Sequence, residues 1–189
     1  MSDTKLRSSI IRLAHANPEL RPHLLPLLSK VAALDFELNI LGKHILEDAV
    51  VSGNARVYGD AEVYGDAKVS GDAEVYENAT VFDNAKVYHH AKVYGDAKVC
   101  GNAEVSVYAK VYDEAKVDGR AEVYGNAKVY GAAKVYGHAQ VYGDAKVYGN
   151  AEVGSKADIS GTAEIVGGYW GGTEGPVYKG KWRAPGVPA

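Results

Sequence analysis

A six-residue repeat without insertions constrains this chain more than any other feature. Alanine recurs at every sixth position from Ala49 to Ala163, twenty times in all. Two residues after each alanine comes valine, except that Ile159 and Ile165 take its place at the end of the series. A fixed short period is typical of solenoids, in which each repeat is one structural unit stacked on its neighbours. The sequence therefore predicts a long, narrow repeat fold with no broad core.

The composition of the hexad indicates how each unit folds. Alanine and valine are two residues apart, so in an extended segment both point to the same side. The residue between them, as at Lys92 or Glu122, then points to water. Glycine followed by aspartate or asparagine, as at Gly59 and Asp60, supplies a tight corner, because glycine reaches positive φ without steric cost. A strand of about three residues is not stable alone, so successive coils must share parallel backbone hydrogen bonds.

These residues resemble the hexapeptide repeat of left-handed parallel β-helices, in which a small residue and Val or Ile recur every six positions. In that family three hexads form each triangular coil. The resemblance covers residues 49–167 and implies an all-β solenoid, a left-handed parallel β-helix of six to seven coils. The chain departs from the family where Tyr follows the valine, since a small or acidic residue is common there. The resemblance also implies a homo-oligomer, with a trimer favoured.

Charge and composition exclude several kinds of partner and compartment. Residues 49–167 hold 12 basic and 17 acidic residues, a net charge near −5 within a chain of net charge −3. We therefore expect no nucleic-acid partner, because wrapping a nucleic acid requires a basic face. The single cysteine, Cys100, cannot form an internal disulfide. The N-terminus shows no secretion signal and no long apolar span, so we expect a soluble protein, cytoplasmic or virion-associated, with no membrane contact.

Segments of different composition flank the repeats. Residues 4–16 have apolar residues at helical spacing, and Pro22 and Pro26 predict a kinked or broken helix that continues to about residue 38. The leucine-rich segment 1–40 is expected either to cap one end of the repeats or to serve in docking or self-association. Residues 41–48 lead into the repeats. The tail 168–189 is rich in Gly and Pro, and its aromatic residues are candidates to cover the other end: Tyr169, Trp170, Tyr178 and Trp182.

A coil of three hexads stacks residues eighteen apart into columns, and one column is rich in tyrosine. A second mixes serine with tyrosine and runs Ser52, Ser70, Tyr88, Ser106, Tyr124, Tyr142. Tyr and Lys columns side by side form a candidate binding face for a regular polymer such as a polysaccharide, or for a protein surface. The alternative is that tyrosine simply suits exposed sheet positions. The candidate residues are Tyr58, Tyr76, Tyr94, Tyr112, Tyr130 and Tyr148 with Lys92, Lys110, Lys128 and Lys146.

One irregular patch interrupts the corners. Glycine is lost at Glu77, Asp83 and His89, and the next coil places Val107 and Tyr108 over His89 and His90. His90 and Tyr108 therefore join the candidate binding residues, because functional positions tend to break local rules. The alternative is drift among corners that accept Asn and Asp readily.

The histidines raise an enzymatic alternative. Many members of the resembled family are acyltransferases with a catalytic histidine near a subunit junction, which makes His89 or His90 the candidate general base. This chain has no loop interrupting the hexads, where such enzymes commonly form their substrate sites. Some relatives bind zinc through three histidines, but His90 and His138 fall in different columns and should not converge. We expect no metal and no cofactor. The sequence favours a non-enzymatic structural or interaction scaffold, self-associating and rigid, over the acyltransferase-like enzyme.

Overall fold

The computed structural model describes residues 45, 48–173 and 175–183. The chain divides into two units, residues 1–43 and 44–189, of which only the second contains described residues. The helical segment predicted before residue 40 lies outside the described residues. Within the described part every regular element is a β-strand, and no helix there is long and apolar enough to cross a membrane.

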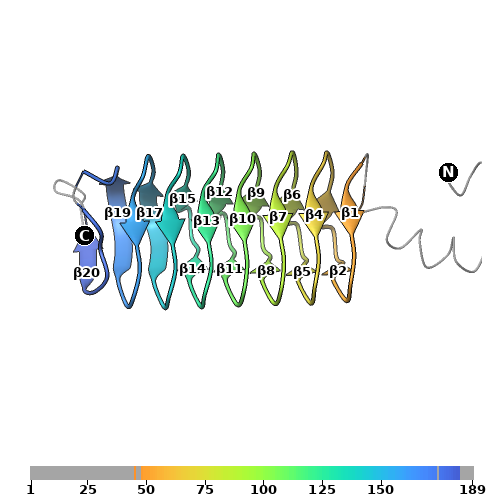
Figure 1. The fold of residues 1–189 in the computed structure, drawn as a ribbon, viewed down its shortest axis with the longest axis horizontal. Helices are drawn as coiled ribbons and strands as arrows, with labels where there is room; N and C mark the ends of the chain where they lie inside the picture. The colour runs from red at the N-terminus through yellow and green to blue at the C-terminus, as the bar shows by residue number, and fades with distance from the viewer. Residues whose placement is uncertain (1–44, 46–47, 174, 184–189) are drawn as a thin grey trace, which may run out of the picture. The chain divides into compact units, whose positions relative to one another are not determined.

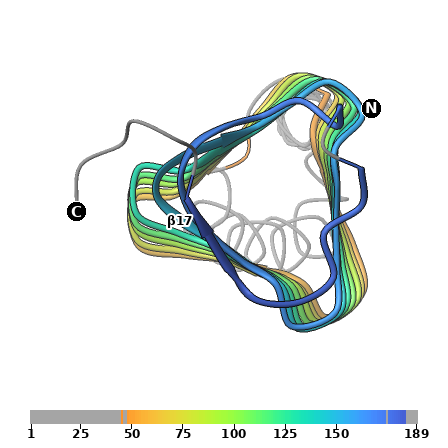
Figure 2. The ribbon, with the colours of Figure 1, turned by 90° about the vertical axis from the view of Figure 1, so that its left-hand side faces the viewer.

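The repeats form a parallel β-solenoid of about seven coils (Figure 1). Seen along its axis, the solenoid is triangular (Figure 2). Three columns of strands make its three faces. Face 1 consists of β1 (Val50–Val51), β4 (Lys68–Val69), β7 (Lys86–Val87), β10 (Glu104–Val105), β13 (Glu122–Val123), β16 (Gln140–Val141) and β18 (Asp158–Ile159).

The other two faces join into one sheet because one long strand, β17 (Lys146–Val153), turns a corner and belongs to both. Face 2 consists of β2 (Arg56–Val57), β5 (Glu74–Val75), β8 (Lys92–Val93), β11 (Lys110–Val111), β14 (Lys128–Val129), the start of β17, β19 (Glu164–Trp170) and β20 (Lys181–Arg183). Face 3 consists of β3 (Glu62–Val63), β6 (Thr80–Val81), β9 (Lys98–Val99), β12 (Lys116–Val117), β15 (Lys134–Val135) and the end of β17.

The predicted stacking of residues eighteen apart is confirmed. Val111 pairs in register with Val93 on one side and Val129 on the other, and the same offset holds in the neighbouring strands. Strands β1 to β16 and β18 are two residues long, shorter than the predicted three, because each alanine already belongs to the corner: the Ala115 N–H donates to the Tyr112 carbonyl at 3.3 Å. Left-handed coiling stays a prediction.

The interior is narrow and apolar throughout. From Ala61 to Val153 every alanine and valine at the two inward positions of the hexad has 0% exposed surface. The hexad's two apolar residues therefore suffice to fill a coil, with small side chains packed at the density of a protein interior. This explains why the chain needs almost no large aliphatic side chains in its repeats.

The corners depend on glycine for a second reason besides positive φ. At Gly125, with φ of 72°, an added Cβ would lie 2.9 Å from the backbone nitrogen of Gly143 in the next coil. The coils approach closely at such corners, so a side chain there is both strained and crowded. Six non-glycine residues in the described part of the chain nevertheless adopt positive φ: Glu77, Asp83, His89, Val107, Asp113 and Ser155.

Parallel pairing continues into the C-terminal tail. Strand β19 pairs with β17 and β20, and Val177 bridges to Ile159. Trp170 is buried in the core at 7% exposure and meets Trp182 edge to face at 6.0 Å. Among the four aromatic residues predicted to cover this end, Trp170 alone is buried, whereas Tyr169, Tyr178 and Trp182 remain about half exposed at 52%, 60% and 45%.

Candidate functional site

The Tyr–Lys face, defined as the tyrosine and lysine columns of face 2, is the most regular surface of the solenoid. All six candidate tyrosines stack into one ladder. Successive ring centroids are 4.8–5.0 Å apart and the ring planes differ by 0–5°. The ladder follows directly from the coil, because strands in register repeat at about 4.8 Å, close to a stacking distance.

Stacking changes what the ladder can bind. Within the ladder the ring faces of Tyr94 and Tyr112 are covered by neighbouring tyrosines, so only ring edges and hydroxyls remain for a partner. Burial, together with the neighbouring tyrosines, raises the pKa of Tyr76 and of Tyr112 to about 12. The hydroxyls therefore stay protonated at neutral pH and can donate hydrogen bonds. A sugar ring cannot stack on the faces inside this ladder.

The lysine column is paired at its ends and unpaired in the middle. Lys92 binds Glu74 and Lys146 binds Glu164, each at 2.8 Å, and these contacts raise the pKa of both lysines. Within the part of the chain that the structure describes, Lys110 and Lys128 have no carboxylate partner. The two central coils of the Tyr–Lys face thus present two cations that no described carboxylate pairs with, beside tyrosine hydroxyls.

The irregular corners have a structural explanation at their acidic positions. The carboxylate of Glu77 accepts a hydrogen bond from the Gly95 N–H of the next coil at 2.7 Å. Asp83 and Asp113 do the same for Gly101 and Gly131, both at 3.1 Å. Each acid gives a corner N–H a charged acceptor, which compensates for the positive φ that a Cβ makes costly. His89 and Val107 make no such bond.

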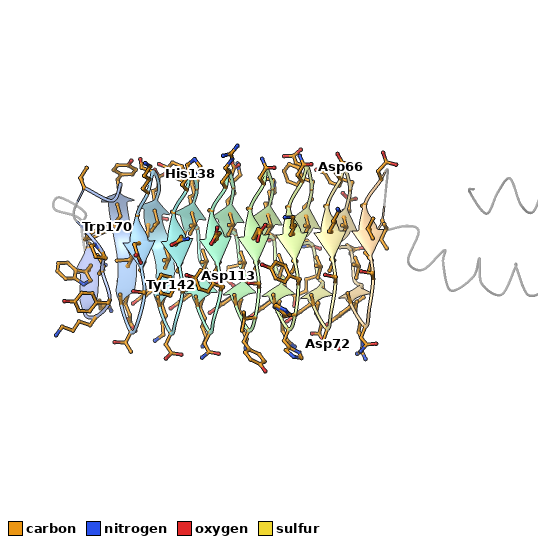
Figure 3. All side chains as sticks on the ribbon, viewed as in Figure 1. Asp66, Asp72, Asp113, His138, Tyr142 and Trp170 are labelled. Atoms are coloured by element: carbon orange, nitrogen blue, oxygen red, sulfur yellow. The ribbon has the colours of Figure 1, made fainter. Side chains whose placement is uncertain are left out.

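The histidines occupy separate corners. His90 stacks on Tyr108 at 5.0 Å, and its Nδ1 lies 3.6 Å from an oxygen of Asp72. Figure 3 shows Asp72 at one edge of the prism and His138 at the opposite edge. The structure thus brings together His90, Tyr108 and Asp72 and leaves His138 apart, as the column positions predict. Among the described residues no three acidic, histidine or cysteine side chains gather as metal ligands.

A cavity on face 1 was not predicted from the sequence. It has a volume of about 290 Å³ and lies where Ser106 interrupts the second column. The sequence does contain a signal for this cavity, because the small Ser106 lies between Tyr88 and Tyr124 in the column and leaves out one ring. That signal can be interpreted only once the rings of a column are known to stack. The lining residues are Tyr88, His89, Glu104, Ser106, Val107, Glu122 and Tyr124.

The single cysteine is not a reactive group. Cys100 is 4% exposed, and burial, with a contribution from Asp118, raises the pKa of its thiol to about 11. A thiol in that state is neither a good nucleophile nor a good metal ligand at neutral pH.

The coiled hexads and their register define the protein as a hexapeptide-repeat parallel β-solenoid. A family model described as the YdcK β-solenoid repeat matches residues 49–65 and 139–155, each a little less than one coil. The unbroken hexads, their eighteen-residue register and these two matches fit the hexapeptide-repeat β-helix family, and two segments of the chain are similar to the YdcK repeat. A search of curated proteins and a search of solved structures found no match.

Proposed function

We propose that this protein is a non-enzymatic scaffold: a rigid, self-associating solenoid that presents its faces to partners. The observation that carries the proposal is the Tyr–Lys face. It is regular, it exposes aromatic edges, and at Lys110 and Lys128 it holds two cations that have no partner among the described residues. Exposed aromatic surface of this kind is characteristic of protein contacts.

Rigidity follows from how the coils are joined. Each hexad donates backbone hydrogen bonds to the next coil, as from Lys110 N–H to the Ala127 carbonyl at 2.9 Å and from Tyr112 N–H to the Val129 carbonyl at 3.0 Å. Bending the axis would stretch these bonds along one face and compress the dry interior on another. A solenoid of this kind holds its surface groups at fixed spacings, which suits a spacer or scaffold.

The partner chemistry follows from the unpaired lysines. A second copy of the chain is our first candidate, and the family resemblance favours a trimer. An external protein or a polysaccharide with anionic groups is the second candidate, because ammonium groups and neutral hydroxyls bind carboxylates and sulfates. In both cases we expect the contact to extend along the solenoid axis, because the lysines and tyrosines of the Tyr–Lys face repeat along that axis.

Light scattering coupled to size-exclusion chromatography tests self-association. The wild-type chain is expected to run as an oligomer, and the double variant Lys110→Glu/Lys128→Glu should shift it towards monomer. The matched control is Lys68→Glu/Lys98→Glu, which makes the same charge change on faces 1 and 3. A wild-type monomer at every concentration would refute self-association, and equal effects of both double variants would refute the assignment to the Tyr–Lys face.

Two structural expectations belong to the same proposal. The coil is left-handed, as the family resemblance implies, and an experimental structure would test the sense directly. Residues 1–40 act as a cap or as a docking segment. Deleting them separates the two: a capped solenoid should become insoluble or melt earlier, whereas loss of a docking segment should leave the melting temperature unchanged.

The acyltransferase-like alternative has one observation in its favour. The carboxylate of Asp72 lies 3.6 Å from Nδ1 of His90, beyond hydrogen-bond distance, and a small rotation of either exposed side chain would let it orient the imidazole as a general base. Calorimetry with acetyl-CoA tests this alternative, with His90→Ala as the variant and His138→Ala as the control at another corner. Binding that is lost only in His90→Ala would support the enzyme, and no binding by the wild type would rule it out.

A further inference from the structure

An aromatic column on face 1 stops abruptly at Ser106. Tyr124 stacks on Tyr142 with ring centroids 4.9 Å apart and planes 2° from parallel, but the coil on its other side contributes Ser106 and no ring. The next aromatic residue in the column is Tyr88, two coils from Tyr124, so their backbones are separated by about 9.6 Å. That distance is two stacking steps. One ring is missing from the column, and among the described residues only the ring of Tyr142 stacks on Tyr124.

Tyr88 and Val107 both line the cavity at this position. The hydroxyl of Tyr88 donates to Oε2 of Glu104 in the next coil at 3.1 Å, as the hydroxyl of Tyr148 does to Glu164. Val107 supplies an apolar wall although its φ is 63°, a conformation in which a β-branched residue is a genuine outlier. No carboxylate bond compensates for that strain, in contrast to Asp113. Retention of a strained side chain in a cavity wall points to a role for that side chain in binding.

The charges around the cavity determine whether a cation or an anion would bind there. Glu104 and Glu122 are direct register neighbours, the one acid–acid pair among the paired strands that the structure describes. Like charges in register repel each other. Lys86 binds Glu104 at 2.8 Å and Gln140 donates to Glu122 at 3.1 Å, so one cation faces two carboxylates. A ligand with positive charge would relieve the excess, and an anion would increase it.

We propose that the cavity over Ser106 binds a planar cation, with the guanidinium group of an arginine derivative as the ligand chemistry. A guanidinium is flat enough to take the missing place in the column and stacks on tyrosine. Its N–H groups form a fork that can reach the carboxylates of Glu104 and Glu122. An ammonium group is positively charged but not planar, and a ureido group is planar but neutral. The site is independent of the Tyr–Lys face and of self-association.

The test compares three matched probes with the full-length protein by NMR titration. N-acetylarginine amide should bind with a dissociation constant on the order of 1 mM, as expected for a small ligand with few contacts. N-acetylcitrulline amide, planar and neutral, and N-acetyllysine amide, charged and not planar, should each bind at least tenfold more weakly. Equal binding of the arginine and citrulline probes would overturn the requirement for charge, and equal binding of the arginine and lysine probes would overturn the requirement for a plane.

Two variants locate the site. Ser106→Tyr inserts the missing ring and should abolish binding of the arginine probe, while its matched control Ser52→Tyr adds a tyrosine to the same column away from the cavity and should bind as the wild type does. Tyr124→Ala removes the stacking face and should weaken binding at least fivefold. Thermal melts verify that each variant is folded. Unchanged affinity in folded Ser106→Tyr would overturn the proposal, as would loss of binding in folded Ser52→Tyr.

Discussion

Replacing Gly125 separates the two demands that a corner makes on its residue. Gly125 has φ of 72°, which costs an L-residue about 1–2 kcal/mol, so Gly125→Ala carries that cost. The new Cβ would also lie 2.9 Å from the backbone nitrogen of Gly143, and backbone cannot easily move away. The corner at Asp113 shows that the solenoid tolerates a Cβ in such a place. We therefore expect Gly125→Ala to lower the free energy of unfolding by about 2–3 kcal/mol.

Aspartate at the same position should be less harmful than alanine, although it is larger. Asp113 accepts a hydrogen bond from the Gly131 N–H at 3.1 Å, and an aspartate at position 125 can make the equivalent bond to Gly143. A hydrogen bond of this kind contributes about 1 kcal/mol, so Gly125→Asp should lose about 1 kcal/mol less stability than Gly125→Ala.

Urea unfolding followed by far-ultraviolet circular dichroism measures both variants. Gly175→Ala is the control, because Gly175 has φ of 78° but its added Cβ would meet nothing within 4 Å. The control should therefore show the φ cost without the crowding. If Gly125→Ala unfolds at the same or a higher urea concentration than Gly125→Asp, the compensation that we assign to the acidic corners is wrong.

Three further predictions test the ladder and the buried thiol. Tyr112→Ala removes two stacked pairs and Tyr58→Ala removes one, so urea unfolding should show losses of about 1–3 and 0.5–1.5 kcal/mol; equal losses would contradict stacking as the cause. Ultraviolet titration should show Tyr76 and Tyr112 ionising near pH 12. The pKa of these two tyrosines in the folded protein lies above the unfolded value of 10.0, so their contribution to stability is complete below pH 10 and is lost as the pH rises through about 12. Ionisation of every tyrosine near pH 10 in the folded protein would contradict the assignment. Cys100, with its raised thiol pKa, should react with iodoacetamide at pH 8 only after unfolding, and rapid labelling of the native protein would show that the site opens.

Much of the architecture was readable from the hexads. The Ala–Val spacing identified the inward face, and the eighteen-residue register followed from three hexads in a coil, as the pairing of Val111 with Val93 and Val129 confirms. The separation of His90 from His138 was predictable for the same reason, since column position is fixed by residue number. In a solenoid without insertions, sequence position alone fixes height and face.

The candidate sites were less predictable, because they depend on how side chains meet between coils. The tyrosine column was predicted as a binding face, but counting residues could not show that its rings cover one another. Glu77 and Asp83 looked like a functional irregularity, yet their carboxylates bond to the corner N–H groups of the next coil. The cavity at Ser106 escaped notice because one serine in a mixed column has no meaning until its neighbours are known to stack.

The sequence by itself determined the period and the inward residues, because these follow from the alternation of side chains along a strand and an unbroken count of six. It determined the columns only with the three hexads per coil that the family resemblance implies. Only the tertiary structure decided which ring faces are covered, which lysines lack a partner and where a cavity opens. Those properties depend on contacts between residues eighteen apart, whose geometry is set by coil spacing and side-chain rotation. The Ala–Val interior follows from the sequence of each single hexad, whereas the surface of the solenoid depends on contacts between neighbouring coils.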